Sequence, residues 1–210
     1  MKTILFDLDG TLIDSTDAIL ESFQIAYDTF CEPVPNADAI KSLIGHPLDV
    51  MFNELGIKGN VWEYVDAYKG HYRVISKAKT FLLPLCLEAL DEASQIATLG
   101  IVTTKTAKYS EELLEHMDIM KYFDVLIGRE SVENPKPHAE PILKAMQHLK
   151  ARVESTWMIG DTILDLHSAK KAGVKSVGVL CGYGHREDLL RETSLVVKDA
   201  LEAVKLIKGR

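Results

Sequence analysis

The sequence predicts an α/β fold, in which a parallel sheet is covered by helices and interrupted by one all-helical insertion. Short runs of β-branched and apolar residues alternate with amphipathic helical patterns along most of the chain, which is typical of parallel sheets. Residues 16–80 break this alternation, because they contain helical patterns and no convincing strand. A length of 210 residues is sufficient for one large domain with such an insertion.

The predicted strands of the core are short apolar runs with helical stretches between most of them. We place the strands at residues 3–6, 99–103, 124–128, 156–160, 176–180 and 195–197. We expect helices near residues 85–95, 107–117, 138–149, 162–172 and 199–208. Together these elements predict a Rossmann-like parallel sheet, and such sheets bind ligands outside the carboxyl ends of their strands.

The insertion contains two apolar stripes with helical spacing. One stripe comprises Ile19, Phe23, Ala26, Tyr27 and Phe30, and the other comprises Val61, Val65, Tyr68, Tyr72 and Ile75. Both stripes indicate helices that pack on one another. We therefore divide the chain into a core of residues 1–15 and 81–210 and a helical cap domain of residues 16–80. The cap domain leaves the core directly after the first strand, where it is placed to cover the end of that strand.

Composition and charge favour a small-molecule partner. The formal net charge is −7 and no basic stretch is dense, which argues against nucleic acid. Asp7 and Asp9 interrupt the first apolar run, so we expect no signal peptide, and no run approaches the roughly 18 apolar residues of a membrane span. The three cysteines, Cys31, Cys86 and Cys181, form no CxxC pair, which favours a reducing compartment. We expect a soluble cytoplasmic protein, either a monomer or a homodimer.

Polar side chains follow four successive predicted strands. They are Asp7 and Asp9, then Thr103, Thr104 and Lys105, then Lys136 in the third loop, and finally Asp161 and Asp165. Taken singly, each has an ordinary structural explanation, such as a turn, a helix cap or a solvated loop. Taken in order, each at a strand end of a parallel sheet, they predict one shared crevice.

The acids of this crevice predict a magnesium site. Side chains at positions i and i+2 of an extended chain point to the same side, so Asp7 and Asp9 are expected to face one place and to repel. Together with Asp161 they supply hard oxygen ligands, which suit Mg²⁺, and a divalent cation offsets the repulsion.

The remaining polar groups predict a site for a phosphate. Thr103 offers a hydroxyl donor, and Lys136 adds a positive charge. We expect the backbone N–H groups of Thr104 and Lys105 to begin a helix, where an anion is favoured.

This set of motifs resembles the haloacid-dehalogenase-like superfamily of phosphohydrolases. "DLDGTL" matches its first motif, Thr103 its second, Lys136 its third and "GDTILD" its fourth. "NPKPHAEPI" is similar to the branch that includes phosphoglycolate phosphatase, in which a helical cap follows the first motif. "VGVLCGYG" also looks like the glycine-containing strand and loop of that branch, although for Gly182 and Gly184 we expect a plain turn with no chemical role.

The resemblance implies a role for each matching residue. Asp7 would be the nucleophile and a Mg²⁺ ligand, and Asp9 the general acid and base, reaching the metal through its backbone carbonyl. Thr103 and Lys136 would hold the transferring phosphoryl group. Asp161 would ligate Mg²⁺, and Asp165 would be an outer-shell residue.

The resemblance leaves the substrate open. His46 stands in "IGHPL", where caps of the family often carry a specificity loop, but the stretch is equally typical of a turn that ends a helix. Relatives often return from the cap through a Pro-Tyr-Pro-Gly-like turn, and "KTFLLPL" retains only Pro84 of it. This departure weakens any transfer of substrate identity.

We predict a Mg²⁺-dependent phosphatase that hydrolyses a small phosphomonoester, such as phosphoglycolate or a phosphosugar, through an aspartyl phosphate. A sugar-phosphate mutase with the same intermediate is the nearest alternative. It is disfavoured because mutases of the superfamily often have valine where Thr11 stands. A dehalogenase would need neither Asp9 nor a metal. A non-catalytic protein that binds a phosphorylated metabolite is a further alternative, but no acid of the motifs is missing.

Overall fold

The computed structural model describes residues 2–210, which form two compact units. The core unit comprises Met1–Asp14 and Leu82–Arg210, and the helical unit comprises Ser15–Phe81. The chain thus leaves the core unit once, after Asp14, and returns once, at Leu82.

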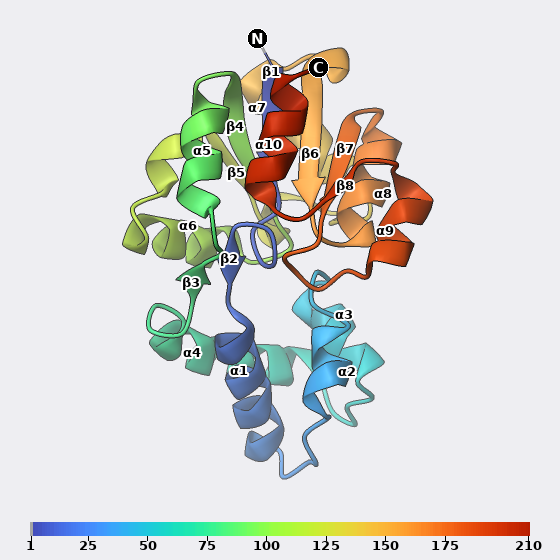
Figure 1. Cartoon of the computed structure of the whole chain (residues 1–210). Helices are drawn as coiled ribbons and strands as arrows, with labels where there is room; N and C mark the ends of the chain where they lie inside the picture. Colours follow the sequence, from blue (N-terminus) through green and yellow to red (C-terminus); the bar gives the residue numbers. More distant parts are fainter. Residues whose placement is uncertain (1) are drawn as a thin grey trace. The chain divides into compact units, whose positions relative to one another are not determined.

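The core unit is built on one six-stranded sheet in which every neighbouring pair of strands is parallel. The strand order is β5-β4-β1-β6-β7-β8 (Figure 1). The strands are β1 (Lys2–Phe6), β4 (Ala97–Val102), β5 (Val125–Ile127), β6 (Thr156–Gly160), β7 (Lys175–Val179) and β8 (Val196–Val197). The predicted α/β fold with a parallel sheet is confirmed.

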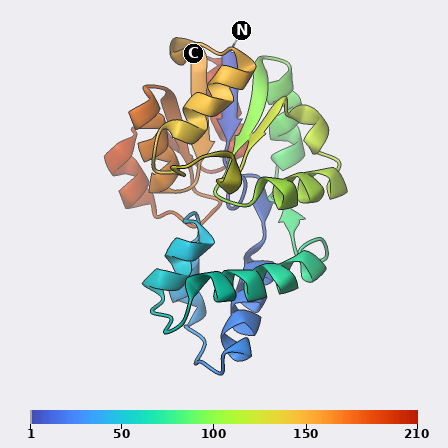
Figure 2. The same cartoon turned by 180° about the vertical axis from the view of Figure 1, so that it is seen from behind.

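Helices cover both faces of this sheet. Helices α5 (Cys86–Ser94) and α10 (Ala200–Lys208) pack together on one face, whereas α7 (Glu140–Leu149) and α8 (Ile163–Ala172) pack together on the other (Figures 1 and 2). Helix α6 (Ala107–His116) lies beside β5. The central strand β1 is enclosed between these layers, because Ile4, Leu5 and Phe6 are fully buried.

Several short elements were not predicted from the sequence. They are α9 (Arg186–Glu192), the paired strands β2 (Ile13–Asp14) and β3 (Phe81–Leu82), and the 3-10 turns η1 (Met120–Tyr122), η2 (Arg129–Ser131) and η3 (Val153–Ser155). Helix α9 buries only Leu189, so it lacks the apolar periodicity by which longer helices are recognised. Two-residue strands are too short for any alternation to show.

The strand order places the crevice of the sheet next to β1. Phe6, the last residue of β1, lies opposite Ile101 of β4 on one side and opposite Ile159 of β6 on the other. From β1 the chain proceeds outward through β4 and β5, and then returns to β6 on the other side of β1. Ligands of open α/β sheets bind where the strand order reverses in this way.

The helical unit consists of α1 (Thr16–Thr29), α2 (Ala37–Lys41), α3 (Leu48–Glu54) and α4 (Val61–Ile75). Its core is aromatic: the ring of Phe23 lies 4.6 Å from that of Phe52 and 5.1 Å from that of Tyr68, measured between centroids. Among the described residues of the two units, no helix has both the length and the apolar character that a membrane span requires.

Candidate active site

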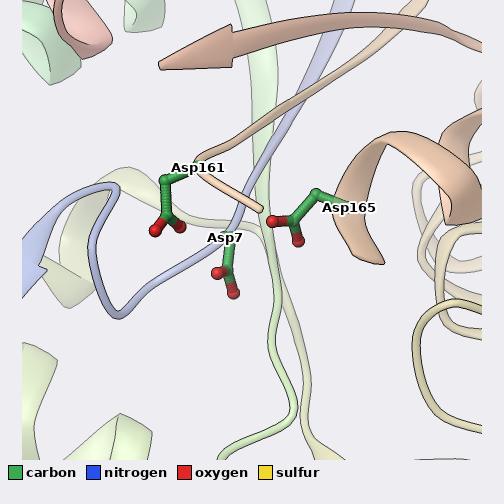
Figure 3. A group of neighbouring side chains, drawn as sticks. All are labelled: Asp7, Asp161 and Asp165. Atoms are coloured by element: carbon green, nitrogen blue, oxygen red, sulfur yellow. The ribbon is translucent and has the colours of Figure 1, made fainter. Parts of the chain in front are cut away.

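Three buried carboxylates meet at the carboxyl ends of β1 and β6. Asp7 directly follows β1, Asp161 directly follows β6, and Asp165 lies in the first turn of α8. Each offers a ligand atom within 4.8 Å of those of the other two. Asp161 and Asp165 are fully buried and Asp7 is 3% exposed. Figure 3 shows the Asp165 carboxylate pointing toward Asp7 from the start of its helix.

The sequence folds this way locally because the ends of β1 and β6 are tied together. The backbone N–H of Asp7 donates to the carbonyl oxygen of Ile159 at 2.9 Å. Gly160 ends β6 where a Cβ would lie 2.3 Å from the Cβ of Asp165, so this position has no room for a side chain. Asp165 Oδ2 accepts hydrogen bonds from both the backbone N–H and the hydroxyl of Thr162, at 3.0 and 2.8 Å, which fix the first turn of α8.

One lysine partly balances the three acids. Nζ of Lys136 lies 2.7 Å from Oδ1 of Asp7 and 2.5 Å from Oδ1 of Asp165. The lysine is 2% exposed, so its charge is desolvated and depends on these partners. Burial by itself would lower the pKa of Lys136, but attraction to Asp165 and Asp7 outweighs this and raises its pKa above the usual value.

The acids themselves are held in an environment that disfavours their charge. Burial, reinforced by the nearby Asp165, raises the pKa of Asp7 to about 7, although Lys136 opposes the shift. Burial and the proximity of Asp7 also raise the pKa of Asp161 well above 3.8. Three carboxylates with one ammonium leave an excess of negative charge, and a divalent cation bound beside them would remove it. The donor set therefore fits Mg²⁺.

Asp9 has a separate partner. Its Oδ2 lies 3.2 Å from Nζ of Lys105, and the two side chains are 13% and 11% exposed. The Asp9 carboxylate is thus paired with a lysine of the neighbouring loop, and the close group of three carboxylates consists of Asp7, Asp161 and Asp165 instead. The prediction that Asp7 and Asp9 face one place assumed an extended chain, whereas β1 ends at Phe6 and both acids lie beyond it.

The loop after β4 differs from the sequence-based prediction. Thr103 is buried, and its N–H donates to Ile127 O at 2.9 Å, but α6 begins only at Ala107. The prediction that the N–H groups of Thr104 and Lys105 begin this helix was therefore wrong. The N–H of Lys105 donates instead to the Thr103 hydroxyl oxygen at 3.2 Å, which forms a turn before the helix.

The first N–H of α6 is also already engaged. The Ala107 N–H donates to Oε2 of Glu130 at 2.8 Å. An argument for phosphate binding from the helix N-terminus consequently does not apply here, and a contribution of Thr104 remains a prediction about its loop.

A glycine-containing loop after β7 surrounds Asp161. The backbone N–H of Tyr183 donates to Asp161 Oδ2 at 2.8 Å. A Cβ at Gly182 would lie 2.1 Å from that oxygen, and a Cβ at Gly184 would lie 2.0 Å from the Asp161 carbonyl oxygen. These glycines are therefore more than a plain turn, because their lack of side chains allows the loop to contact the acid.

Two contacts of the site were missed by sequence reasoning. The Thr11 hydroxyl donates to Asp161 Oδ1 at 3.2 Å, and Lys105 pairs with Asp9. Thr11 belongs to the first motif and Lys105 stands two residues after Thr103, and this closeness to the motifs is the signal that could have found them. His46 belongs to the helical unit, where it is half-buried and burial lowers its pKa. Its role in selectivity remains a prediction.

The comparison with known families is decisive for the identity of this site. A family model described as haloacid dehalogenase-like hydrolase matches residues 4–179, which include every acid and lysine described above. The chain belongs to the haloacid dehalogenase-like hydrolases. The family predicted from the sequence motifs is thereby confirmed.

Individual relatives of this hydrolase cover nearly the whole chain. It is 34% identical over 208 residues to IndB of Dickeya dadantii, a protein provisionally named a phosphatase, with 96% of this chain and 90% of that protein covered. It is 30% identical over 226 residues to a phosphoglycolate phosphatase of Salmonella choleraesuis, with 95% and 89% covered. The names of these relatives support the predicted class of phosphoric monoester hydrolase.

A solved structure shows the same fold. A haloacid dehalogenase-like family hydrolase from Streptococcus pneumoniae superimposes with a TM-score of 0.90 at 29% identity, and 98% of each chain is covered. The similarity extends over both units, so the helical insertion is shared with that protein.

Proposed function

We propose that this hydrolase is a Mg²⁺-dependent phosphatase that transfers the phosphoryl group of a small phosphomonoester to Asp7 and then to water. The observation that carries the proposal is the buried group of Asp7, Asp161 and Asp165 around Lys136 at the crevice of the sheet. The phosphatase names of the relatives support the same reaction.

Some residues of the site would bind the metal ion, and others would bind the phosphoryl group of the substrate. We propose that Asp7 and Asp161 ligate Mg²⁺ with side-chain oxygens, and Asp9 with its backbone carbonyl. Both oxygens of Asp165 already accept hydrogen bonds, from Lys136 and Thr162, which supports an outer-shell role. Once bound, the ion would offset the repulsion between the Asp7 carboxylate and an anionic phosphate.

Lys136, Thr103 and the loop at Thr104 would hold the phosphoryl group. Lys136 provides the charge, because its ammonium group already lies against the nucleophile. The Thr103 hydroxyl lies at the end of β4, next to β1 in the sheet. A buried lysine and a fixed hydroxyl can stabilise the charge of the transferring group without reorganising.

The reaction would proceed in two balanced steps. A carboxylate oxygen of Asp7 attacks phosphorus, the bond to the leaving oxygen breaks, and Asp9 donates a proton to that oxygen. A water molecule then gives a proton to Asp9 and attacks the phosphorus of the aspartyl phosphate. The bond between phosphorus and the Asp7 oxygen breaks, and inorganic phosphate is released with both acids restored.

A phosphatase assay with p-nitrophenyl phosphate tests this proposal. We expect turnover with Mg²⁺, loss of turnover with EDTA, and recovery when excess Mg²⁺ is added. Asp7→Asn is the matched negative control, because a contaminating phosphatase would remain active in that preparation. Turnover that is equal in the Asp7→Asn protein, or that is unaffected by EDTA, would contradict the proposal.

The substrate is proposed to be phosphoglycolate or a small phosphosugar. The phosphoglycolate phosphatase relative supports the first choice, and the missing Pro-Tyr-Pro-Gly-like turn keeps the second open. A panel of phosphorylated metabolites assayed with wild-type protein and with His46→Ala would test both the substrate and the proposed selectivity role of His46. Equal losses on every substrate would contradict that role.

Cytoplasmic location and a monomeric or homodimeric state remain predictions.

A further inference from the structure

We propose that Thr11 is a positioning residue that orients the Asp161 carboxylate as a metal ligand before the ion binds. This inference rests on the proposed Mg²⁺ site. It concerns a residue whose hydroxyl contacts Asp161 and is proposed to act through it.

Each oxygen of Asp161 has one donor, and the two donors come from different loops. The Thr11 hydroxyl donates to Oδ1 at 3.2 Å, and the Tyr183 N–H donates to Oδ2 at 2.8 Å. Two donors on the two oxygens fix the rotation of the carboxylate about its last bond. Because a carboxylate oxygen can accept about two hydrogen bonds, each oxygen retains capacity for a cation.

Steric constraints place Asp161 in one position between the same loops. A Cβ at Gly10 would lie 2.4 Å from Asp161 Oδ2, and a Cβ at Gly182 would lie 2.1 Å from it. The backbone at Gly10 and at Gly182 therefore lies so close to the Asp161 carboxylate that neither position has room for a side chain. Of the two hydrogen bonds to Asp161, the one from Thr11 comes from a side chain, so a substitution can remove it.

Thr11 is itself held rigidly enough to serve this purpose. It is 1% exposed, and its backbone N–H donates to Leu8 O at 3.3 Å within the turn that follows β1. The threonine thus links the loop after β1, which carries Asp7 and Asp9, to the acid at the end of β6. Residues that orient a metal ligand in this way typically change metal affinity by 10- to 100-fold when they are replaced.

The test is the affinity for Mg²⁺ without substrate, measured by calorimetry and by the rise in Tm with Mg²⁺ concentration. We expect Thr11→Val, which keeps the shape and removes the hydroxyl, to raise the Kd of Mg²⁺ by about 10- to 100-fold. Thr11→Ser keeps the hydroxyl and should bind Mg²⁺ within about 3-fold of wild type. In turnover, the kcat of Thr11→Val should recover at saturating Mg²⁺.

Thr156→Val is the matched control. Thr156 is fully buried at the start of β6, and its hydroxyl donates to Arg152 O at 2.7 Å, at the opposite end of the strand from Asp161. This control loses a buried hydrogen bond of the same kind, so it should lower Tm and leave the Kd of Mg²⁺ unchanged. If Thr11→Val does not fold, Thr11→Ala replaces it in the comparison with Thr11→Ser.

The outcomes separate this inference from the proposed function. If wild type binds Mg²⁺, Asp161→Asn abolishes binding and Thr11→Val binds like wild type, the inference is wrong and the metal site stands. If Thr11→Ser and Thr11→Val both bind Mg²⁺ more weakly than wild type and to the same extent, the inference is also wrong, because the loss of affinity would not follow the hydroxyl. If wild type itself binds no Mg²⁺, both the metal site and the role of Thr11 are overturned.

Discussion

Nζ of Lys136 lies 2.7 Å from Oδ1 of Asp7, although the two residues are 129 positions apart in the sequence. The contact joins the loop before α7 to the end of β1 in the centre of the sheet. Both side chains are buried, so each charge depends on the other, and removal of either one has consequences for stability as well as for catalysis.

Replacement of Lys136 by Ala should lower kcat by about 10²-fold or more, because the phosphoryl group loses a preorganised charge. The variant should also lose about 3–5 kcal/mol of stability, since Asp7 and Asp165 would be left without their buried partner. Activity assays and denaturant unfolding measure the two effects. Lys208→Ala is the control, because it breaks an exposed pair with Glu92 and should change little. Unchanged kcat and KM in Lys136→Ala would make the "NPKP" loop merely structural.

Replacement of Asp7 by Asn should abolish turnover while the fold is retained, because the amide has nearly the same shape and lacks the nucleophilic charge. In metal-free protein at alkaline pH, the Tm of this variant should equal or exceed that of wild type. Burial raises the pKa of Asp7 to about 7, so its ionised form is destabilising there, and the neutral amide avoids that cost.

Asp118→Asn provides the control for this experiment. Asp118 is exposed, has φ +57° and pairs with Lys121, and Asn tolerates this backbone conformation well. The control should keep full activity. Turnover of Asp7→Asn within about tenfold of wild type would remove Asp7 from the mechanism.

The effect of Mg²⁺ on stability should grow as pH rises. Burial raises the pKa of Asp7 from 3.8 to about 7 and raises that of Asp161 well above 3.8. At a pH between the unfolded and the folded pKa of an acid, the metal-free folded protein keeps a proton that the unfolded chain has released. The free energy of unfolding of the metal-free protein therefore falls as pH rises. A bound cation replaces those protons and reverses the trend.

Thermal unfolding with Mg²⁺ and with EDTA, from about pH 5 to about pH 8, measures this linkage. The Tm difference between the two conditions should widen across that range. In Asp161→Asn the difference should be small throughout, because a ligand is missing. A Tm difference that is constant with pH in wild type would show that Mg²⁺ does not compete with protons at these acids.

The position of the acids at the strand ends could be predicted from the sequence, because it depends only on the order of strands and helices along the chain. Parallel strands end at one edge of a sheet, so Asp7, Thr103 and Asp161 were expected at the same edge once the alternation of strands and helices was recognised, and Asp7 and Asp161 do lie close together. Lys136 was predicted from its motif, and its contact with Asp7 required the path of a long loop to be known.

The remaining contacts of the site depend on loop conformation, which has no periodicity in the sequence. Tyr183 contacts Asp161 through its backbone N–H, so its side chain could not have revealed the interaction. The helix expected near residues 107–117 does begin at Ala107, but the N–H of Lys105 was wrongly assigned to its start, because that N–H donates to the Thr103 hydroxyl oxygen. Lys105, which stands in the turn before that helix, pairs with Asp9.

The last prediction concerns how Asp9 differs from Asp7. If both acids served only to bind the metal, Asp9→Asn and Asp7→Asn should fail alike, and added Mg²⁺ should partly rescue both. The structure supports different roles, because the Asp9 carboxylate pairs with Lys105, whereas Asp7 belongs to the group of three carboxylates. A general acid matters most when the leaving group is poor. Asp9→Asn should therefore slow hydrolysis of an alkyl phosphate far more than the first step with p-nitrophenyl phosphate, whose leaving group needs little protonation.

The second step should also suffer in Asp9→Asn, because the water that attacks the aspartyl phosphate loses its base. The variant is expected to release a burst of p-nitrophenol and then to stall, since Asp7 can still accept the phosphoryl group. Single-turnover kinetics on both substrates at several Mg²⁺ concentrations measure this, and Asp14→Asn, at the exposed end of β2, is the control. Equal losses on the two leaving groups, with recovery at high Mg²⁺, would mean that Asp9 serves as a ligand only.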